Sequence, residues 1–160
     1  MAENGRVTLV IFSGELDKAL AAFNIAIGAA SMGMEVSMFF TFWGLNVIKR
    51  NEGSIISKGL MRKVLNRMNR GGAKRLPLSK FQMFGLGKWM IGRLMRDVKS
   101  PPLEELIAMA KGMGVKFIAC TTSMGMMGIG KEAFITEVDS FAGVATYLAE
   151  AKDGKVNLFI

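Results

Sequence analysis

The sequence has no histidine and only one cysteine, Cys120. Without histidine, the chain cannot form a Ser-His-Asp triad, a Cys-His pair or a histidine-ligated zinc or iron site. A single cysteine also cannot form a disulfide or a thiolate metal site within one chain. We therefore expect neither a metal nor a cofactor. Any general acid or base must be an aspartate, a glutamate, a lysine, a tyrosine or the thiol itself.

Long apolar runs are missing as well. A membrane-spanning helix needs roughly 18 to 20 continuous apolar residues, and no segment of this sequence reaches that length. The apolar run Val7–Phe12 is also too short for the hydrophobic part of a signal peptide. The sequence therefore predicts a cytoplasmic protein. Because 51% of its 160 residues are hydrophobic, we expect one domain with its own core over residues 1–160.

Positive charge is concentrated in one part of the chain. Twelve lysines and arginines lie between Lys58 and Lys99 beside one acid, Asp97, which gives that part a net charge of +11. The remainder has nine basic and twelve acidic residues, a net charge of −3. The basic character therefore belongs to one segment and not to the whole surface.

The rest of the sequence alternates between strand-like and helical segments. Val7–Phe12 is an apolar run of the kind found in parallel strands that are covered on both faces. Apolar residues then recur with helical spacing from Leu16 to Ser31, and Gly33 is a suitable stop. A second run, Val36–Phe42, completes a strand–helix–strand unit of a parallel sheet. Further strands are expected at Val115–Cys120, Ala133–Glu137 and Val156–Ile160, and further helices at residues 103–113, 122–127 and 141–151.

These elements predict a five-stranded α/β fold with a helical insertion after the second strand, at about residues 45–100. One helical stripe of the insertion runs from Met61 to Met68, and residues 81–99 form a basic amphipathic helix. The apolar face of that helix can pack on the core or on a second subunit. It can also dock a partner protein or lie on an anionic membrane. The sequence leaves these alternatives open.

Cys120 is the residue best placed for chemistry. It ends a predicted strand, and ligands of open parallel sheets bind beyond the carboxyl ends of the strands. If a helix begins at Thr122, its free N–H groups point back toward the thiol and favour the thiolate. A thiolate can attack a sulfur donor and hold the transferred atom as a persulfide. The alternative is that Cys120 is buried as a small apolar residue.

Two other segments of the sequence reach the same edge of the sheet. Gly14 follows the first strand and is suited either to close approach of a ligand or to an ordinary turn. Trp43 follows the second strand and is suited either to a pocket wall or to packing. No glycine motif for nucleotide phosphates follows the first strand. The candidate substrate-binding residues are Gly14, Thr41, Trp43, Thr121, Thr122, Ser123 and Met124.

Three strings carry a family resemblance: SGELDKA at residues 13–19, GMEV with FFTFWG within residues 33–44, and ACTTSM with MG within residues 119–128. Together they resemble the DsrE/DsrF-like family, and especially its branch of larger sulfurtransferase or peroxiredoxin-like proteins. The Met- and Lys-rich insertion is also similar to that branch. The resemblance implies a three-layer α/β/α domain with a five-stranded parallel sheet, and homo- or hetero-oligomers.

The resemblance further implies that Cys120 receives or passes sulfur in a relay, often with TusA-like carriers. Our leading hypothesis is therefore a sulfur-relay protein or sulfurtransferase, with its status as an enzyme left open. The alternative is a non-catalytic binding or assembly module that docks a partner protein or an anionic membrane through residues 81–99. Apolar residues in the insertion also predict a homo-oligomer. Nucleic-acid binding is disfavoured, because aromatic residues are sparse among the basic ones and no recognition motif is present.

Overall fold

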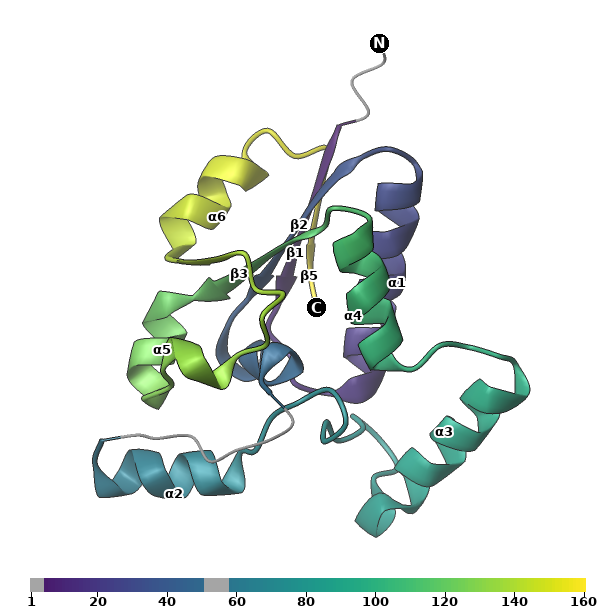
Figure 1. The fold of residues 1–160 in the computed structure, drawn as a ribbon, viewed down its shortest axis with the longest axis vertical. Coiled ribbons are helices and arrows are strands. Elements are labelled where there is room, and N and C mark those ends of the chain that lie inside the picture. The colour runs from purple at the N-terminus through teal and green to yellow at the C-terminus, as the bar shows by residue number, and fades with distance from the viewer. Residues whose placement is uncertain (1–4, 51–57) are drawn as a thin grey trace.

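Five parallel strands form one sheet in the computed structural model, which describes residues 5–50 and 58–160 (Figure 1). The strand order is β4-β3-β2-β1-β5, and every neighbouring pair is parallel. The predicted α/β fold with a five-stranded parallel sheet is therefore confirmed. The strands are β1 (Arg6–Ile11), β2 (Glu35–Phe40), β3 (Lys116–Cys120), β4 (Ser140–Ala142) and β5 (Val156–Phe159).

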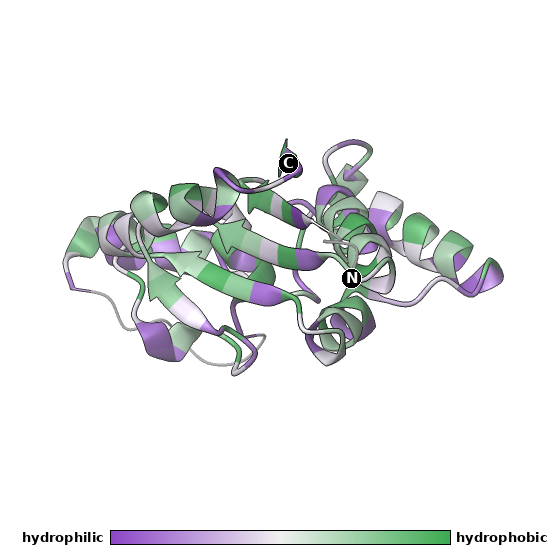
Figure 2. Cartoon of the chain, turned by 90° about the horizontal axis from the view of Figure 1, so that it is seen from above, coloured by the Kyte–Doolittle hydropathy of each residue, from purple (hydrophilic) through white to green (hydrophobic). Residues whose placement is uncertain are grey.

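Helices cover both faces of the sheet, which gives the three layers that the resemblance implied (Figure 1). Helices α1 (Leu16–Ser31) and α4 (Leu103–Gly112) pack side by side on one face, and α6 (Val144–Ala151) lies on the other. The short helix α5 (Thr121–Met127) follows β3 directly. The bounds of α1 are those predicted, and Gly33 follows it at a φ of 78°, which favours glycine. Figure 2 shows mainly hydrophobic residues along the strands between these layers.

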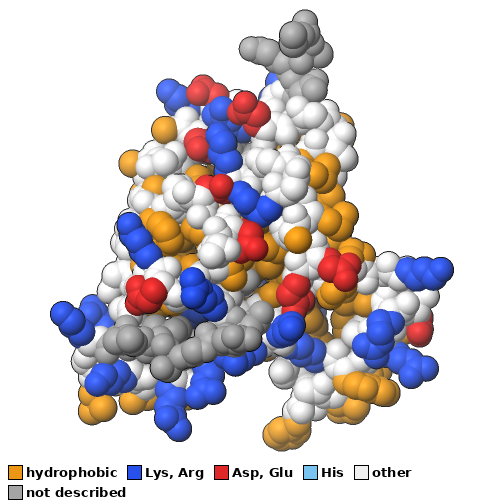
Figure 3. Space-filling model, in the orientation of Figure 1, with side chains coloured by type: hydrophobic (Ala, Val, Ile, Leu, Met, Phe, Trp, Pro, Cys, Tyr) orange, Lys and Arg blue, Asp and Glu red, His pale blue; other side chains and the backbone are white. Residues whose placement is uncertain are grey.

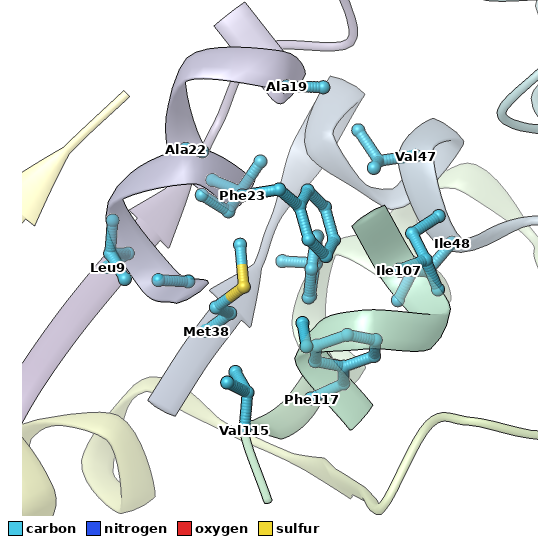
Figure 4. Close-up of a cluster of buried hydrophobic side chains, with 14 of the residues drawn as sticks. Leu9, Ala19, Ala22, Phe23, Met38, Val47, Ile48, Ile107, Val115 and Phe117 are labelled. Atoms are coloured by element: carbon cyan, nitrogen blue, oxygen red, sulfur yellow. The ribbon is translucent and has the colours of Figure 1, made fainter. Parts of the chain in front are cut away.

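Three phenylalanines lie in the middle of the core between the sheet and the layer formed by α1 and α4. Phe23 of α1, Phe40 of β2 and Phe117 of β3 are fully buried, with ring centroids 5.6 to 6.4 Å apart. Figure 4 shows Phe23 and Phe117 within this cluster. Helix α1 approaches the sheet closely because Ala19 and Ala22 present only methyl groups to it. Each buried aromatic side chain contributes about 1.5–3 kcal/mol, so this layer anchors the fold.

The opposite face of the sheet has a smaller apolar cluster, which includes Cys120. Two buried hydroxyl residues of this face bond to polar groups around α6. The Thr8 hydroxyl lies 3.3 Å from the Tyr147 hydroxyl and donates to Asn157 at 2.6 Å, and the Ser37 hydroxyl donates to Glu150. Helix α6 is therefore held on this face partly by polar contacts.

Two predictions in the C-terminal part are wrong. The fourth strand is Ser140–Ala142 and not Ala133–Glu137. The apolar signal of the predicted segment came from Phe134, which is buried in the core but forms only a single antiparallel bridge, to Lys49, and no strand. The predicted helix also begins later than Phe141, at the start of α6, because Phe141 belongs to β4. Burial alone therefore did not distinguish a strand from a loop that packs inward.

The chain between β2 and α4 begins as part of the core. Its first element is the 3-10 segment η1 (Phe42–Ile48), in which Leu45, Val47 and Ile48 are fully buried. Although the insertion was expected to begin at about residue 45, these side chains pack in the main apolar cluster. The segment that departs from the core therefore starts after η1.

Two helices follow in the insertion, α2 (Leu60–Met68) and α3 (Leu86–Asp97), with a 3-10 turn, η2 (Met83–Gly85), before α3. The predicted helix over residues 81–99 is therefore too long at its start. Phe81 and Phe84 adopt φ angles of 56° and 54°. Side chains other than glycine resist this left-handed region, which cannot continue a right-handed helix.

Both helices lie beyond the carboxyl ends of the strands, at the lower end in Figure 1. Helix α2 contacts α5, where the buried Asn66 side chain donates to the main-chain carbonyl of Met127 at 3.0 Å. Helix α3 stands away from the sheet and leaves Trp89, Met90 and Leu94 exposed. Figure 3 shows lysine and arginine side chains gathered around this end. Within residues 5–50 and 58–160, no helix has the length and apolar character of a membrane span.

Candidate functional site

Cys120 lies where β3 ends and α5 begins. Side chains alternate between the faces of a strand, so Ala119 packs in the core beneath α1 and α4, whereas Ile118 and Cys120 pack on the opposite face. Cys120 itself is only 4% exposed. A reagent or donor can therefore reach the sulfur only if it is small or if the neighbouring segments open.

Two hydroxyl groups from separate segments meet beside the thiol. Strands β2 and β3 pair with Phe40 opposite Ala119, so Thr41 follows β2 at the level of Cys120. Ser123, in the first turn of α5, is buried, and its hydroxyl lies 2.8 Å from the Thr41 hydroxyl. Parallel pairing and the immediate start of α5 thus bring both hydroxyls to the sulfur.

These groups change the acidity of the thiol. Burial raises the pKa of Cys120, because it disfavours the charged thiolate. Hydrogen bonds from the main-chain N–H and hydroxyl of Ser123, from the Thr41 hydroxyl and from the Thr122 N–H lower it. The hydrogen bonds outweigh burial, so the pKa of Cys120 lies below its ordinary value. The arrangement favours the nucleophilic form of cysteine.

The predicted residues after Cys120 occupy different environments. Thr122 contributes its main-chain N–H to the thiol, while its side chain and that of Thr121 are exposed. Met124 is buried in the main apolar cluster. Groups of Thr41, Thr122 and Ser123 therefore surround the sulfur, whereas the Met124 side chain packs α5 against the main apolar cluster.

The predicted residues Gly14 and Trp43 lie in a second place, a cavity of about 320 Å³ that does not have Cys120 in its lining. A Cβ atom on Gly14 would lie 2.6 Å from the carbonyl oxygen of Trp43, so close packing of two backbone segments requires glycine there. Most of this cavity's wall could not be identified from the sequence, because its residues come together only in the tertiary structure. The wall consists of Ser13, Gly14, Glu15, Trp43, Asn46, Met68, Asn69, Arg70, Arg75, Leu76 and Pro77.

A buried lysine lies close to this cavity. Lys49 is 2% exposed, and its ammonium group donates to the main-chain carbonyl of Asn69 at 3.4 Å. Burial lowers the pKa of Lys49 to about 8. Among the residues that the structure describes, no carboxylate forms an ion pair with it. The positive charge is therefore poorly compensated.

Metal-binding side chains do not cluster in the described part of the chain. No group of three or more histidine, cysteine, aspartate or glutamate residues there could hold an ion. The groups that bond to the Cys120 thiol are the hydrogen-bond donors of Thr41, Thr122 and Ser123.

Comparison with known sequences relates nearly the whole chain to one protein family. The model of the DsrE/DsrF/DrsH-like family matches residues 3–159. Uncharacterized protein YrkE of Bacillus subtilis (strain 168) is 43% identical over 155 residues, which cover 97% of this chain and 96% of YrkE. Sulfur carrier protein DsrE2 of Allochromatium vinosum is 28% identical over 165 residues, which cover 99% of each chain.

Solved structures support the fold at lower sequence identity. The YchN protein of Escherichia coli superposes with a TM-score of 0.58 at 9% identity, over 98% of this chain and 99% of YchN. MTH1491 of Methanobacterium thermoautotrophicum, a protein of unknown function, superposes with a TM-score of 0.56 at 13% identity and the same coverage. At these identities the likeness concerns the fold alone. The match over residues 3–159 and the identity to YrkE show that the chain belongs to the DsrE/DsrF/DrsH-like family.

Proposed function

We propose that this protein carries sulfur as a persulfide on Cys120, as a sulfur-relay protein or sulfurtransferase. The observation that carries the proposal is the set of N–H and hydroxyl donors around a thiol whose pKa they lower. The same donors, from Thr41, Thr122 and Ser123, suit the negative charge of a persulfide. The likeness to DsrE2, which is named a sulfur carrier protein, supports the same chemistry.

The proposed reaction needs no external oxidant. The Cys120 thiolate attacks the outer sulfur of a donor such as thiosulfate and forms a new S–S bond. The donor's own S–S bond breaks, and its electron pair leaves with sulfite. Cys120 then holds the sulfur as a persulfide anion. An acceptor thiolate attacks the outer sulfur in the second step, and the Cys120 thiolate leaves with the electron pair of the broken bond.

The proposed acceptor or donor protein is a TusA-like sulfur carrier. The positively charged helices α2 and α3 flank the edge of the sheet at which Cys120 lies. Opposite charge on a carrier would speed its encounter with this edge. Because Cys120 is only 4% exposed, transfer to a protein requires local opening near the start of α5.

Intact mass spectrometry tests the proposal. The protein is incubated separately with thiosulfate, with polysulfide and with a persulfidated carrier protein, and its mass is measured before and after reduction. We expect one added sulfur atom that a thiol reductant removes, and none on Cys120→Ser. Absence of an adduct with all three donors would contradict the proposal. An equal adduct on Cys120→Ser would contradict it as well.

A second candidate function is docking on an anionic membrane through α3. The specific observation is that Trp89, Met90 and Leu94 are each at least half exposed on a helix that also carries Lys88 and Arg93. Such helices bind at the surface of a bilayer by apolar burial and by attraction to anionic lipids. The competing explanation is that this face packs on another subunit or on a partner protein.

Vesicle flotation separates these explanations, and the chain offers a matched control. Leu94 on α3 and Leu148 on α6 are 55% and 57% exposed. If α3 docks, wild type floats with phosphatidylserine vesicles but not with phosphatidylcholine vesicles, and Leu94→Glu reduces flotation while Leu148→Glu does not. Equal behaviour of the two variants, or no flotation of wild type, would exclude docking through α3.

We also propose that the chain forms a homo-oligomer. Phe12, Phe42 and Phe159 form an exposed aromatic cluster, in which Phe12 lies 5.6 Å from Phe42 and 5.7 Å from Phe159 between ring centroids. Large exposed apolar groups of this kind are typical of interfaces. Light scattering should give more than the monomer mass of 17.4 kDa, and Phe159→Ser should lower it. A monomeric wild type would refute the proposal.

A further inference from the structure

The cavity beside Gly14 and Trp43 is built by two parts of the chain that are far apart in the sequence. Ser13, Gly14 and Glu15 follow β1, while Trp43 and Asn46 belong to η1. The opposite wall comes from residues 68–70 at the end of α2 and from residues 75–77. With a volume of about 320 Å³, the cavity falls in the size range of small-molecule sites.

The lining of this cavity is electropositive. Arg70 and Arg75 both contribute to the wall, and neither forms an ion pair with another residue in the described part of the chain. Glu15, the one carboxylate of the lining, is already paired with Lys18 at 2.5 Å and accepts a hydrogen bond from Ser13. The lining therefore carries two arginines that no carboxylate of the described residues pairs with.

The lining also contains two asparagine side chains. Asn46 and Asn69, both in the lining, form a reciprocal amide pair, with Nδ2–Oδ1 distances of 2.7 and 3.3 Å. Each amide keeps a second N–H group that this pair does not use. The buried ammonium group of Lys49 lies 3.4 Å from the carbonyl oxygen of Asn69. The wall thus combines buried donors with positive charge, which is the combination that recognises an oxyanion.

The backbone between the two arginines is fixed by close packing. A Cβ atom on Gly71 would lie 2.8 Å from the Asn46 Cα atom and 2.9 Å from its carbonyl oxygen. Gly72 follows at a φ of 112°, and its N–H donates to the Asn46 carbonyl at 2.8 Å. The two glycines therefore press this turn against η1 and place Arg70 and Arg75 on either side of it. A wall held in this way is preorganised for a ligand.

We propose that this cavity is a binding site for a small divalent oxyanion of the thiosulfate and sulfate class. Arg70 and Arg75 supply the charge, and Asn46, Asn69 and Trp43 form the remaining contact surface. Trp43 follows Thr41, which contacts the Cys120 thiol, by two positions in the chain. The chain thus links the cavity wall to the segment that bonds to Cys120, but oxyanion binding does not require that Cys120 carry sulfur.

Fluorescence titration tests the site, because one of the chain's two tryptophans lines it. Trp89→Phe leaves Trp43 as the only tryptophan, and Cys120→Ser in the same protein prevents sulfur transfer. Titration at constant ionic strength uses sodium thiosulfate, sodium sulfate and, as a monovalent control, sodium chloride. We expect a saturable change in Trp43 emission with both divalent anions and competition between them, but no saturation with chloride.

Charge-matched variants locate the bound anion. Arg70→Gln and Arg75→Gln should each weaken binding about tenfold, since each removes a charge-assisted hydrogen bond. Arg93→Gln and Arg96→Gln remove the same charge from α3, away from the cavity lining, and should change affinity less than about twofold. Glu15→Gln removes the one acid of the lining and should strengthen binding about two- to fivefold.

Two results would overturn this inference. One is the absence of saturable binding of thiosulfate or sulfate. The other is equal weakening by the cavity and the α3 variants, which would mean a diffuse charge effect. Because the titration uses Cys120→Ser protein, its failure leaves sulfur carriage untouched. Conversely, a wild-type protein that binds oxyanions but gains no sulfur in the mass measurement would refute sulfur carriage alone.

Discussion

The α/β core and the insertion's helices α2 and α3 bury their apolar side chains to very different extents. In the core, aromatic residues such as Phe23 are fully buried. In the insertion, Phe84, Met61 and Met68 are almost wholly exposed, among basic residues. The core therefore positions Cys120, whereas helices α2 and α3 present most of their charged and apolar side chains outward. The content of hydrophobic residues alone therefore does not tell a buried core segment from an exposed insertion helix.

The largest difference in stability is expected between matched Phe→Ala substitutions, one in the core and one in the insertion. Phe23→Ala leaves a cavity in the main cluster and should lower the free energy of unfolding by about 3–5 kcal/mol. Phe84→Ala removes an exposed ring and should change it by less than about 0.5 kcal/mol. Urea denaturation measures both. Similar losses for the two variants would mean that α3 and η2 pack on the folded core in solution.

A smaller effect is expected at Lys49, a cation buried next to the junction of the two regions. Lys49→Met should raise the free energy of unfolding at pH 7 by about 1–3 kcal/mol, because it removes a poorly compensated buried charge. Urea denaturation of wild type and Lys49→Met measures this difference. Both proteins are unfolded in a buffer without divalent oxyanions, since a bound anion would stabilise the wild type.

The pH dependence of that effect has a defined sign. The pKa of Lys49 is about 8 in the folded state and about 10.4 in an unfolded chain. Between these values the unfolded chain binds the extra proton, so the stability of the wild type rises with pH. The advantage of Lys49→Met should therefore be full below pH 8 and shrink toward pH 10.4. Parallel stability curves for the two proteins over this range would contradict the burial of a charged lysine.

The two hydroxyl groups beside the thiol should each change the free energy of ionising Cys120 by about 1 kcal/mol. Thr41→Val and Ser123→Ala each remove a hydrogen bond to the thiolate and should raise the pKa of Cys120. The rate of alkylation by iodoacetamide as a function of pH measures the shift. Thr121→Val is the matched control, because its exposed hydroxyl makes no bond to the thiol. An equal shift in that control would assign the effect to general disturbance of α5.

The smallest effect should come from the contact that ties the insertion to α1. The Asp17 carboxylate accepts a hydrogen bond from the Ser79 N–H at 2.9 Å and another from the Ser79 hydroxyl. Burial raises the pKa of Asp17, but these bonds outweigh burial and lower it. Asp17→Asn should therefore cost about 0.5 kcal/mol at pH 7, since the carboxylate is exposed and screened.

Acid should abolish the Asp17 contribution in a defined window. A lowered carboxylate pKa stabilises the fold above the unfolded value of about 3.9, and this stability is lost as pH falls through the folded pKa. Wild type and Asp17→Asn should thus converge in stability at an acidic pH below the lowered folded pKa of Asp17. A constant difference down to that pH would mean that the carboxylate plays no part in holding the insertion.

Much of the core could be predicted because its pattern is local. Helical spacing and a following glycine defined α1 from Leu16 to Ser31, and three apolar runs marked β1, β2 and β3. The short strand β4 could not be found in this way. Its three residues, Ser140–Ala142, are only partly buried, so they lack the apolar run of a central strand, and pairing with β3 alone makes them a strand.

The candidate site was predictable to a similar degree. Cys120 could be identified from its place at a strand end, and Thr41 from its place after the neighbouring strand. Their contact depends on the register of β2 and β3, which no local pattern contains. Arg70 and Arg75 were counted in the basic segment, but their position beside Trp43 follows only from the packing of Gly71 on η1.

The acidity of Cys120 tests the central claim most directly, because that claim is a thiolate prepared by hydrogen bonds in the core. The chain has one cysteine, so the ultraviolet absorbance of the thiolate during a pH titration reports on this residue alone, with Cys120→Ser as the baseline. We expect a midpoint clearly below about 8.5, the ordinary cysteine value. A midpoint at or above that value would contradict the claim and leave Cys120 as a buried apolar residue.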